Sequence, residues 1–374
     1  MYDPHQDMMT EDSTLEMLYG LGELNFETNA FGQDILTPTF HAWLIDLIEV
    51  DKRLRDLSQQ ISFLDSEYLI QPVAFGSEEV VQLNTDPLLD TLQNAFTVLV
   101  TIFDPEQPMP YRPSPYVQQF LWAFKECAYL QEEGFHTQPT MTREIAEQTV
   151  LELNARLGAW YQGLMQPAFT KQCKRNNLNS LANYRSLKRF ISELFAHHNR
   201  LLVLRVDLAY SEIDGPGIDY DTVRHHREQL CSLFYRHGLF THLLGFTWKL
   251  EWRPKKGFHY HFLFFFDANR VREDVTIAHQ IGQLWTQQIT GCQGHYHNCN
   301  RNAENIYYYN ALGEVTYYDA GKRQGLDLLA QYLTKPDEYA SMAVLGRRTF
   351  QTSHVRRKPE GPRPGRPRQR QSVF

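Results

Sequence analysis

The chain has 374 residues, of which 42% are hydrophobic and 22% are charged, as is ordinary for a soluble globular protein with one large core or two. No apolar run approaches the roughly 20 residues of a membrane-spanning helix, and the first fifty residues lack the Lys or Arg of a secretion signal. Five scattered cysteines, an odd number, favour a reducing cytoplasm over a disulfide framework.

The formal net charge of −7 conceals a difference between the two halves of the chain. Residues 1–150 hold 25 Asp and Glu and 6 Lys and Arg, whereas the remaining residues hold 19 and 31. The net charges are therefore −19 and +12. This division predicts that only the second half of the chain contacts a polyanion.

The first half is predicted to be helical. Residues 1–38 are polar and acidic with interspersed glycines, and we expect them to be poorly ordered. Between 39 and 175 apolar residues recur at helical spacing, and Asp86-Pro87 is typical of a helix start. Four helices are expected, near 39–64, 87–103, 116–130 and 140–165. Nothing here resembles a nucleotide-binding loop or a metal cluster, so 39–175 is interpreted as an acidic, all-helical accessory domain.

The second half alternates strands and helices. The order expected for 180–345 is β-α-β-β-α-β followed by a terminal helix, an α+β fold with helices on one face of an antiparallel sheet of four or five strands. The strands are predicted at 201–208, 243–251, 257–266, 306–309 and 315–318, and the helices at 181–198, 220–237, 274–290 and 326–335. Residues 346–374 carry nine Lys and Arg against one Glu, which predicts a disordered basic tail.

The strand at 257–266 has the sequence GFHYHFLFFF. Side chains alternate along a strand, so His259 and His261 lie on the same face about 7 Å apart. The apolar residues that follow indicate a buried central strand. Two neighbouring imidazoles can hold one divalent ion, although a His-x-His pair can also simply line a polar face.

The terminal helix carries Tyr332 and Lys335, three residues apart and therefore on one helix face. A tyrosine can attack a phosphodiester and retain the phosphoryl group as a covalent ester. A nearby lysine can stabilise the charge of that phosphate. A structural role for this Tyr-x-x-Lys sequence is the alternative, because helices commonly end in lysine.

These segments together resemble a known superfamily. Gly257-Phe258-His259-Tyr260-His261 resembles the histidine–hydrophobic–histidine motif of the HUH endonucleases, and Tyr332-Leu333-Thr334-Lys335 resembles the tyrosine motif of their single-tyrosine replication proteins. The range 183–350, which includes Asn298-Cys299-Asn300, is similar to inovirus-type replication proteins of filamentous phages and prophages. Tyr260 departs from the usual aliphatic residue, but it faces away from the histidines. The acidic half matches only in being helical.

The resemblance implies a rolling-circle replication initiator that nicks and rejoins DNA at an origin. Tyr332 would become linked to a 5′-phosphate with the help of Lys335 and of Mg²⁺ or Mn²⁺. The implied partners are single-stranded or hairpin origin DNA and host replication proteins. Two other functions remain open: a DNA-binding regulator that no longer nicks, and an HUH-type transposase.

A third metal ligand is required, because two imidazoles leave most of the coordination sphere to oxygen donors. The resemblance assigns this role to a carboxylate, and Glu251 at the end of the preceding strand is the first candidate. It shares the histidine face only if it pairs with His259 or His261, which requires a loop with an odd number of residues. Asp207 is the second candidate, with an ion pair to Arg205 as its structural alternative.

Three further groups could bind ligands. Cys292, His295, His297 and Cys299 could bind zinc, although the tight spacing and the absence of a predicted strand or helix favour an ordinary loop. The turn containing Arg253, Lys255 and Lys256 is expected to contact DNA phosphates. The basic tail is expected to bind duplex DNA. Within it Arg363, Arg366 and Arg368 include a sequence that resembles an AT-hook core, with Pro364 in place of the usual basic residue.

Overall fold

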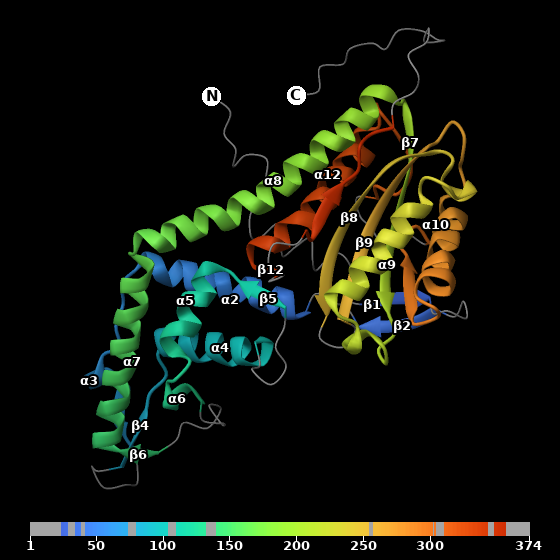
Figure 1. Cartoon of the computed structure of the whole chain (residues 1–374). Helices are drawn as coiled ribbons and strands as arrows, with labels where there is room; N and C mark the ends of the chain where they lie inside the picture. Colours follow the sequence, from blue (N-terminus) through green and yellow to red (C-terminus); the bar gives the residue numbers. More distant parts are fainter. Residues whose placement is uncertain are drawn as a thin grey trace, which may run out of the picture.

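The computed structural model describes residues 24–28, 34–38, 42–73, 80–103, 110–131, 140–253, 257–301, 303, 310–342 and 348–356. The chain forms two lobes, and the long helix α8 (Pro167–His197) runs from the first lobe along the side of the second (Figure 1). Among the helices described here, none is long and apolar enough to cross a membrane.

The second lobe is built on an antiparallel sheet of eight strands. Seven follow the order β13-β8-β9-β7-β10-β1-β2, and β11 also pairs with β7. Strand β9 lies between β8 and β7 and is buried along its whole length, as its run of apolar residues predicts. The strands are β1 (Leu24–Thr28), β2 (Asp34–Pro38), β7 (Arg200–Tyr210), β8 (Leu243–Arg253), β9 (Gly257–Asp267), β10 (Gly294–Asn298), β11 (Gly313–Thr316) and β13 (Phe350–Thr352).

Helices cover both faces of this sheet, so the prediction of helices on one face is wrong (Figure 1). Phe262 and Phe264 of β9 pack with α9 (Tyr220–Leu233) and α10 (Asp274–Gln283), which continues into a π-helical turn (Leu284–Ile289). Leu263 and Phe265, on the opposite face, pack in the core that includes α8 and α12 (Ala320–Thr334). The alternation of β9 thus separates two apolar cores, since apolar residues occupy every position from Phe262 to Phe266 and so both faces of the strand.

The first lobe contains strands as well as helices, which corrects the prediction of an all-helical domain. Asp86 caps α4 and Pro87 opens it, as predicted. The helix predicted at 116–130 is divided into two. The helices are α2 (Ala42–Gln59), α3 (Ser66–Leu69), α4 (Pro87–Ile102), α5 (Pro115–Phe124), α6 (Ala128–Gln131) and α7 (Arg143–Leu164), and the three-stranded sheet is β3 (Ile70–Pro72), β4 (Val80–Leu83) and β6 (Met141–Thr142).

Several segments predicted to be irregular are strands. β1 and β2 fall within 1–38, β10 lies in the loop predicted around the second histidine pair, and β13 lies within the predicted tail. In each case pairing with a neighbouring strand supplies hydrogen bonds that the local sequence does not reveal. Arg356 also belongs to the fold, because its guanidinium donates to the carbonyl oxygens of Phe234 and Phe240. The strand predicted at 306–309 lies outside the described residues.

The two lobes are joined by a strand pair. β5 (Tyr111–Pro113) of the first lobe pairs with β12 (Ala340–Met342), which follows α12. The Tyr111 hydroxyl also accepts a hydrogen bond from the Trp252 N–H at 2.8 Å and donates one to the Trp252 carbonyl at 2.9 Å. The hydroxyl of Tyr111 therefore hydrogen-bonds the backbone near the end of β8, where the short edge strand β13 no longer pairs with it.

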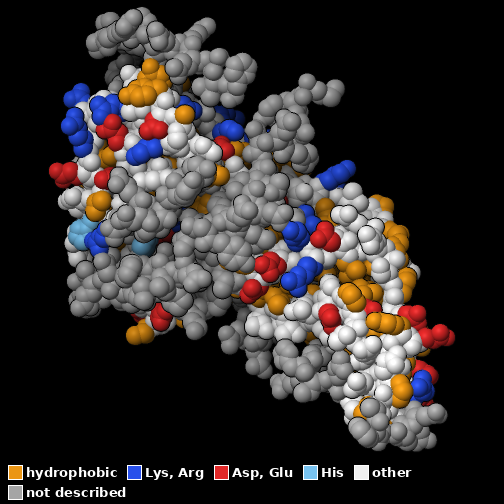
Figure 2. All heavy atoms as spheres, turned by 180° about the vertical axis from the view of Figure 1, so that it is seen from behind, with side chains coloured by type: hydrophobic (Ala, Val, Ile, Leu, Met, Phe, Trp, Pro, Cys, Tyr) orange, Lys and Arg blue, Asp and Glu red, His pale blue; other side chains and the backbone are white. Residues whose placement is uncertain are grey.

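The contrast in charge between the two halves is less marked on the surface. Seen from behind, Lys and Arg side chains and Asp and Glu side chains both lie on each lobe (Figure 2). On the face seen in this view, charges of one sign therefore do not cover a whole lobe.

Candidate active site

The two histidines of β9 lie beside each other as predicted, with ring centroids 4.8 Å apart. Gly257 starts the strand with a φ of +67°, which disfavours any other residue. A Cβ atom there would lie 2.2 Å from the carbonyl oxygen of Gly215. The glycine of the motif therefore lets the histidine strand approach the turn after β7.

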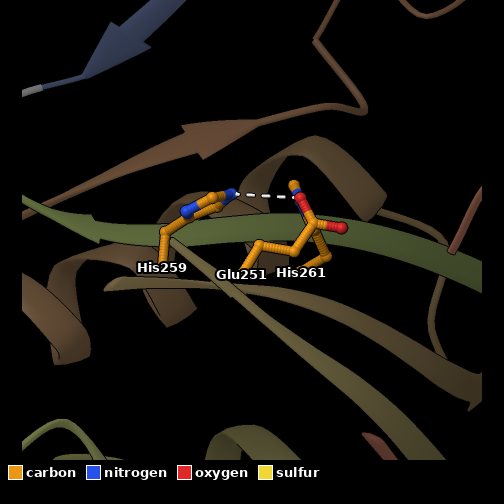
Figure 3. Close-up of side chains that lie close together, drawn as sticks. All are labelled: Glu251, His259 and His261. Atoms are coloured by element: carbon orange, nitrogen blue, oxygen red, sulfur yellow. Dashed lines mark hydrogen bonds and ion pairs between the residues drawn. The ribbon is translucent and has the colours of Figure 1, made fainter. Parts of the chain in front are cut away.

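Glu251 occupies the predicted position. Arg253 pairs with Gly257 across a loop of three residues, an odd number, so Glu251 lies directly opposite His259. One oxygen of Glu251 is 3.1 Å from His261 Nε2 and 3.5 Å from His259 Nε2. Figure 3 shows these three side chains converging. All three are buried, and their ligand atoms lie within 4.8 Å of one another.

Asp207, the second candidate, has a different environment. It lies opposite His261 on the other side of β9, and its Oδ1 is 2.8 Å from His261 Nδ1. Arg205 donates to both carboxylate oxygens of Asp207, at 2.9 and 2.8 Å. The ion pair between Arg205 and Asp207, which the sequence suggested as the structural alternative for Asp207, is therefore present. Within the described residues the one group of three possible metal ligands consists of Glu251, His259 and His261.

Charges around His261 shift the pKa values of its neighbours. Burial would lower the pKa of His261, but the carboxylates of Asp207 and Glu251 outweigh it and raise that pKa. Burial likewise opposes ionisation of the two acids. For Asp207, Arg205 and His261 overcome this effect and hold the pKa well below its usual value, and for Glu251 the two histidines do so. Both carboxylates are therefore charged at neutral pH.

Tyr332 lies beside this group. The tyrosine and His261 have ring centroids 6.1 Å apart, and Arg205 lies over the tyrosine ring at 4.8 Å. Arg205 Nη2 is 3.4 Å from the tyrosine hydroxyl. The side chain is only 6% exposed, and burial raises its pKa to about 12. Helix α12 thus places a protonated phenol next to the carboxylate–histidine group.

Lys335 lies one turn beyond Tyr332, but α12 ends at Thr334. Lys335 opens a short 3-10 helix (Lys335–Glu338), and its Nζ is 2.7 Å from Glu338 Oε2. Lys335 keeps helical backbone angles as the C-cap of α12, and its ammonium group is held by a buried ion pair within the turn. A second ion pair anchors the same turn, since Lys249 of β8 contacts Asp337.

The sequence pattern did not place two further residues at this site, Lys249 and His297, and it indicated Arg205 only as an ion-pair partner of Asp207. Lys249 lies opposite His261, and His297 lies opposite Asp207 on β10. Residues directly opposite each other in a sheet share a face. The repeated spacing His295-Tyr296-His297, the same as in β9, was the signal that could have identified β10.

The alternative zinc site receives no support from the described residues. His295 contacts the backbone carbonyl of Tyr210, Cys292 is exposed, and Cys299 is buried. These residues form no group of possible ligands among those described. Of the predicted DNA contacts, Arg253 is the last residue of β8. The others, Lys255, Lys256, Arg363, Arg366 and Arg368, lie outside the described residues.

Comparison with known proteins gives one match. A family model described as YagK/YfjJ C-terminal domain matches residues 166–353. No curated protein and no solved structure matches the chain. The matched range runs from the start of α8 to the end of β13, so it includes the candidate site and six of the eight strands of the large sheet. Because it covers just over half of the sequence, the chain belongs to the YagK/YfjJ C-terminal domain family.

Proposed function

We propose that the protein is an HUH-type DNA strand transferase that nicks and rejoins one strand at a replication origin. The observation that carries this proposal is the position of Tyr332 beside Glu251, His259 and His261. A nucleophile and a set of metal ligands from separate elements converge on one face of the sheet. Neither group alone would indicate phosphodiester chemistry.

The donor set fits a divalent cation such as Mg²⁺ or Mn²⁺. Two imidazoles and one ionised carboxylate leave the remaining positions to water and to a phosphate oxygen. Glu251, His259 and His261 would hold the ion. When bound, it would polarise the phosphate and assist departure of the 3′-oxygen.

The chemistry assigned to the protein itself is transfer of a phosphoryl group to Tyr332. The phenol oxygen loses its proton and bonds to phosphorus, while the bond from phosphorus to the 3′-oxygen breaks and that oxygen gains a proton. Arg205, next to the hydroxyl, would stabilise the negative charge as the phenol ionises. Reversal of the step rejoins the strand and needs no ATP.

The arrangement of elements also supports the proposal. From Arg200 to Asn298 the chain runs β7, α9, β8, β9, α10, β10, and the histidine strand lies at the centre of the sheet. We expect this succession of elements for an HUH-type domain, although its last strand is β10, a segment predicted to be a loop. The site is almost fully buried, so a DNA strand can reach Tyr332 only after the surrounding segments move.

The test is formation of a covalent protein–DNA adduct. The protein would be incubated with Mn²⁺ and supercoiled plasmids carrying the DNA that flanks its own gene, and nicked products would be resolved on denaturing gels. Tyr339, seven residues beyond Tyr332, is the competing nucleophile. We expect protein-linked nicked DNA from the wild type and from Tyr339→Phe, and none from Tyr332→Phe. Retained DNA binding by Tyr332→Phe would show that the fold persists.

Other outcomes of this experiment would favour a different nucleophile or one of the two alternative functions. An adduct formed by Tyr332→Phe would overturn the assignment of the nucleophile. Specific DNA binding by a wild type that never forms an adduct would favour the regulator, and joining to unrelated DNA would favour a transposase.

A further inference from the structure

The outward face of α8 is strongly basic. The helix contains six Lys and Arg and one acidic residue, Glu193. At 100° per residue, Lys171, Arg175, Arg185 and Arg189 fall within an arc of about 80° on the side opposite the buried residues. All four are exposed. The sequence pattern does not reveal this surface, because it predicts a helix that begins near Leu181.

The inward face of α8 holds the segment that carries Tyr332. The hydroxyl of Ser180 donates to the Thr334 carbonyl at 2.9 Å, and the Asn176 side chain donates to the Glu338 carbonyl. Tyr184 donates to Asp327 of α12 at 2.8 Å. The basic face and the nucleophile therefore lie on opposite sides of one helix, at a fixed separation.

The dimensions of the basic face suit a nucleic-acid backbone. From Lys171 to Arg189 the helix rises about 27 Å, close to one turn of B-DNA, which is roughly 34 Å. Arg189 also lines a groove of about 510 Å³ between α8 and the segment 352–355, together with Ser186, Glu193 and His354. Lys188 differs from the four cations, because it forms an ion pair with Asp327.

We propose that this face, Lys171, Arg175, Arg185 and Arg189, binds the phosphates of duplex DNA next to the nicking site. Charge complementarity selects the partner, since four exposed cations with no acid between them match a regularly charged polyanion, and Glu193, on the same face, follows the last of them by one turn. The position of the duplex relative to the nick rests on the proposed function. Binding to the duplex itself does not.

The experiment compares two quadruple variants of the full chain. The first carries Lys171→Gln, Arg175→Gln, Arg185→Gln and Arg189→Gln. The matched control carries four equally conservative changes at exposed arginines elsewhere, Arg143→Gln, Arg236→Gln, Arg270→Gln and Arg272→Gln. Affinity for a fluorescent 30-base-pair duplex would be measured by anisotropy at several salt concentrations. Circular dichroism would verify that both variants are folded.

The slope of log affinity against log salt concentration falls in magnitude by about 0.9 for each phosphate contact that is lost. We therefore expect this slope to be smaller in magnitude by roughly 2 to 4 in the first variant. The control should match the wild type. An unchanged slope in the first variant, or an equal loss in both, overturns the proposal. Loss of self-association with unchanged DNA binding would instead assign the face to a second copy of the chain.

This measurement is independent of the nicking assay. If the wild type forms no adduct but the first variant loses duplex affinity, the proposed function is refuted and the duplex-binding role of the basic face of α8 is supported. If the wild type forms adducts and both variants bind duplex DNA as well as the wild type does, the proposed function is supported and the duplex-binding role of the basic face of α8 is refuted.

Discussion

Arg205 connects the groups of the candidate site. It donates two hydrogen bonds to Asp207, lies over the ring of Tyr332, and is buried. A guanidinium can satisfy a carboxylate with two parallel hydrogen bonds and still lie flat on an aromatic ring, and a lysine cannot.

We therefore expect Arg205→Lys to slow adduct formation roughly 10- to 100-fold, as is typical of residues that support a metal site. Arg200→Lys is the matched control. Arg200 lies on the same strand, and its partner Glu314 is partly exposed. Single-turnover gels of adduct formation would measure both rates. An Arg205→Lys rate equal to that of the wild type would contradict a positioning role.

The two candidate carboxylates can be ranked by metal binding. Glu251 contacts both histidines, whereas Asp207 is held by Arg205. We expect Glu251→Ala to weaken Mn²⁺ binding by at least roughly 10- to 100-fold, and Asp207→Asn to weaken it less. Isothermal titration calorimetry with Mn²⁺ measures this directly, without nicking. A larger loss in Asp207→Asn would transfer the ligand role to Asp207.

At the scale of residues, parity arguments located three side chains correctly. Side-chain alternation placed His259 and His261, and an odd loop placed Glu251. Asp207 was also recognised, with its ion pair to Arg205 as the alternative. The odd loop that puts Glu251 opposite His259 also puts Lys249 opposite His261, so Lys249 could have been identified from the same register. His297 was missed because the pairing of β10 with β7 is long-range and is not encoded locally.

Among the elements, strand β9 depends on a single backbone conformation. Gly257→Ala would place a Cβ atom 2.2 Å from the Gly215 carbonyl oxygen, at a φ of +67°. We expect a loss of about 1 to 3 kcal/mol in the free energy of unfolding, as for other strained backbone positions.

Gly217→Ala, in the same turn, is the control, because a Cβ there meets no atom within 4 Å. Urea denaturation of both variants would measure the difference. Equal stability would show that the β9 start tolerates a side chain.

At the scale of elements, the first part of helix α8 could not be predicted from the apolar pattern of the sequence. Its first three turns are polar and mostly exposed, so they lack the apolar periodicity by which the later part was predicted. Pro167 was the available start signal, because proline is favoured in the first turn of a helix.

For the whole molecule, the hydroxyl of Tyr111 couples the first lobe to the site. It bonds the backbone of Trp252, the residue after Glu251. Tyr111 and Trp43 also line a small cavity together with Lys249 and Glu251.

We expect Tyr111→Phe to destabilise the protein by about 1 to 3 kcal/mol, the cost of leaving a poorly solvated N–H and C=O without their partner. Tyr68→Phe, at an exposed tyrosine of the same lobe, should have almost no effect. Thermal unfolding would compare them, and equal melting temperatures would show that the hydroxyl contributes nothing to lobe docking.

The β5–β12 pair also governs when the protein can finish folding during synthesis. Arg112 and Ser341 are partners across this pair although 229 positions separate them along the chain. As the ribosome proceeds, β5 remains without its partner until β12 emerges, and closing so long a loop is slow. Tyr332 is translated shortly before β12. The nascent chain therefore acquires its candidate nucleophile and the closure of its two lobes almost together, and it cannot complete the site before α12 and β12 have been synthesised.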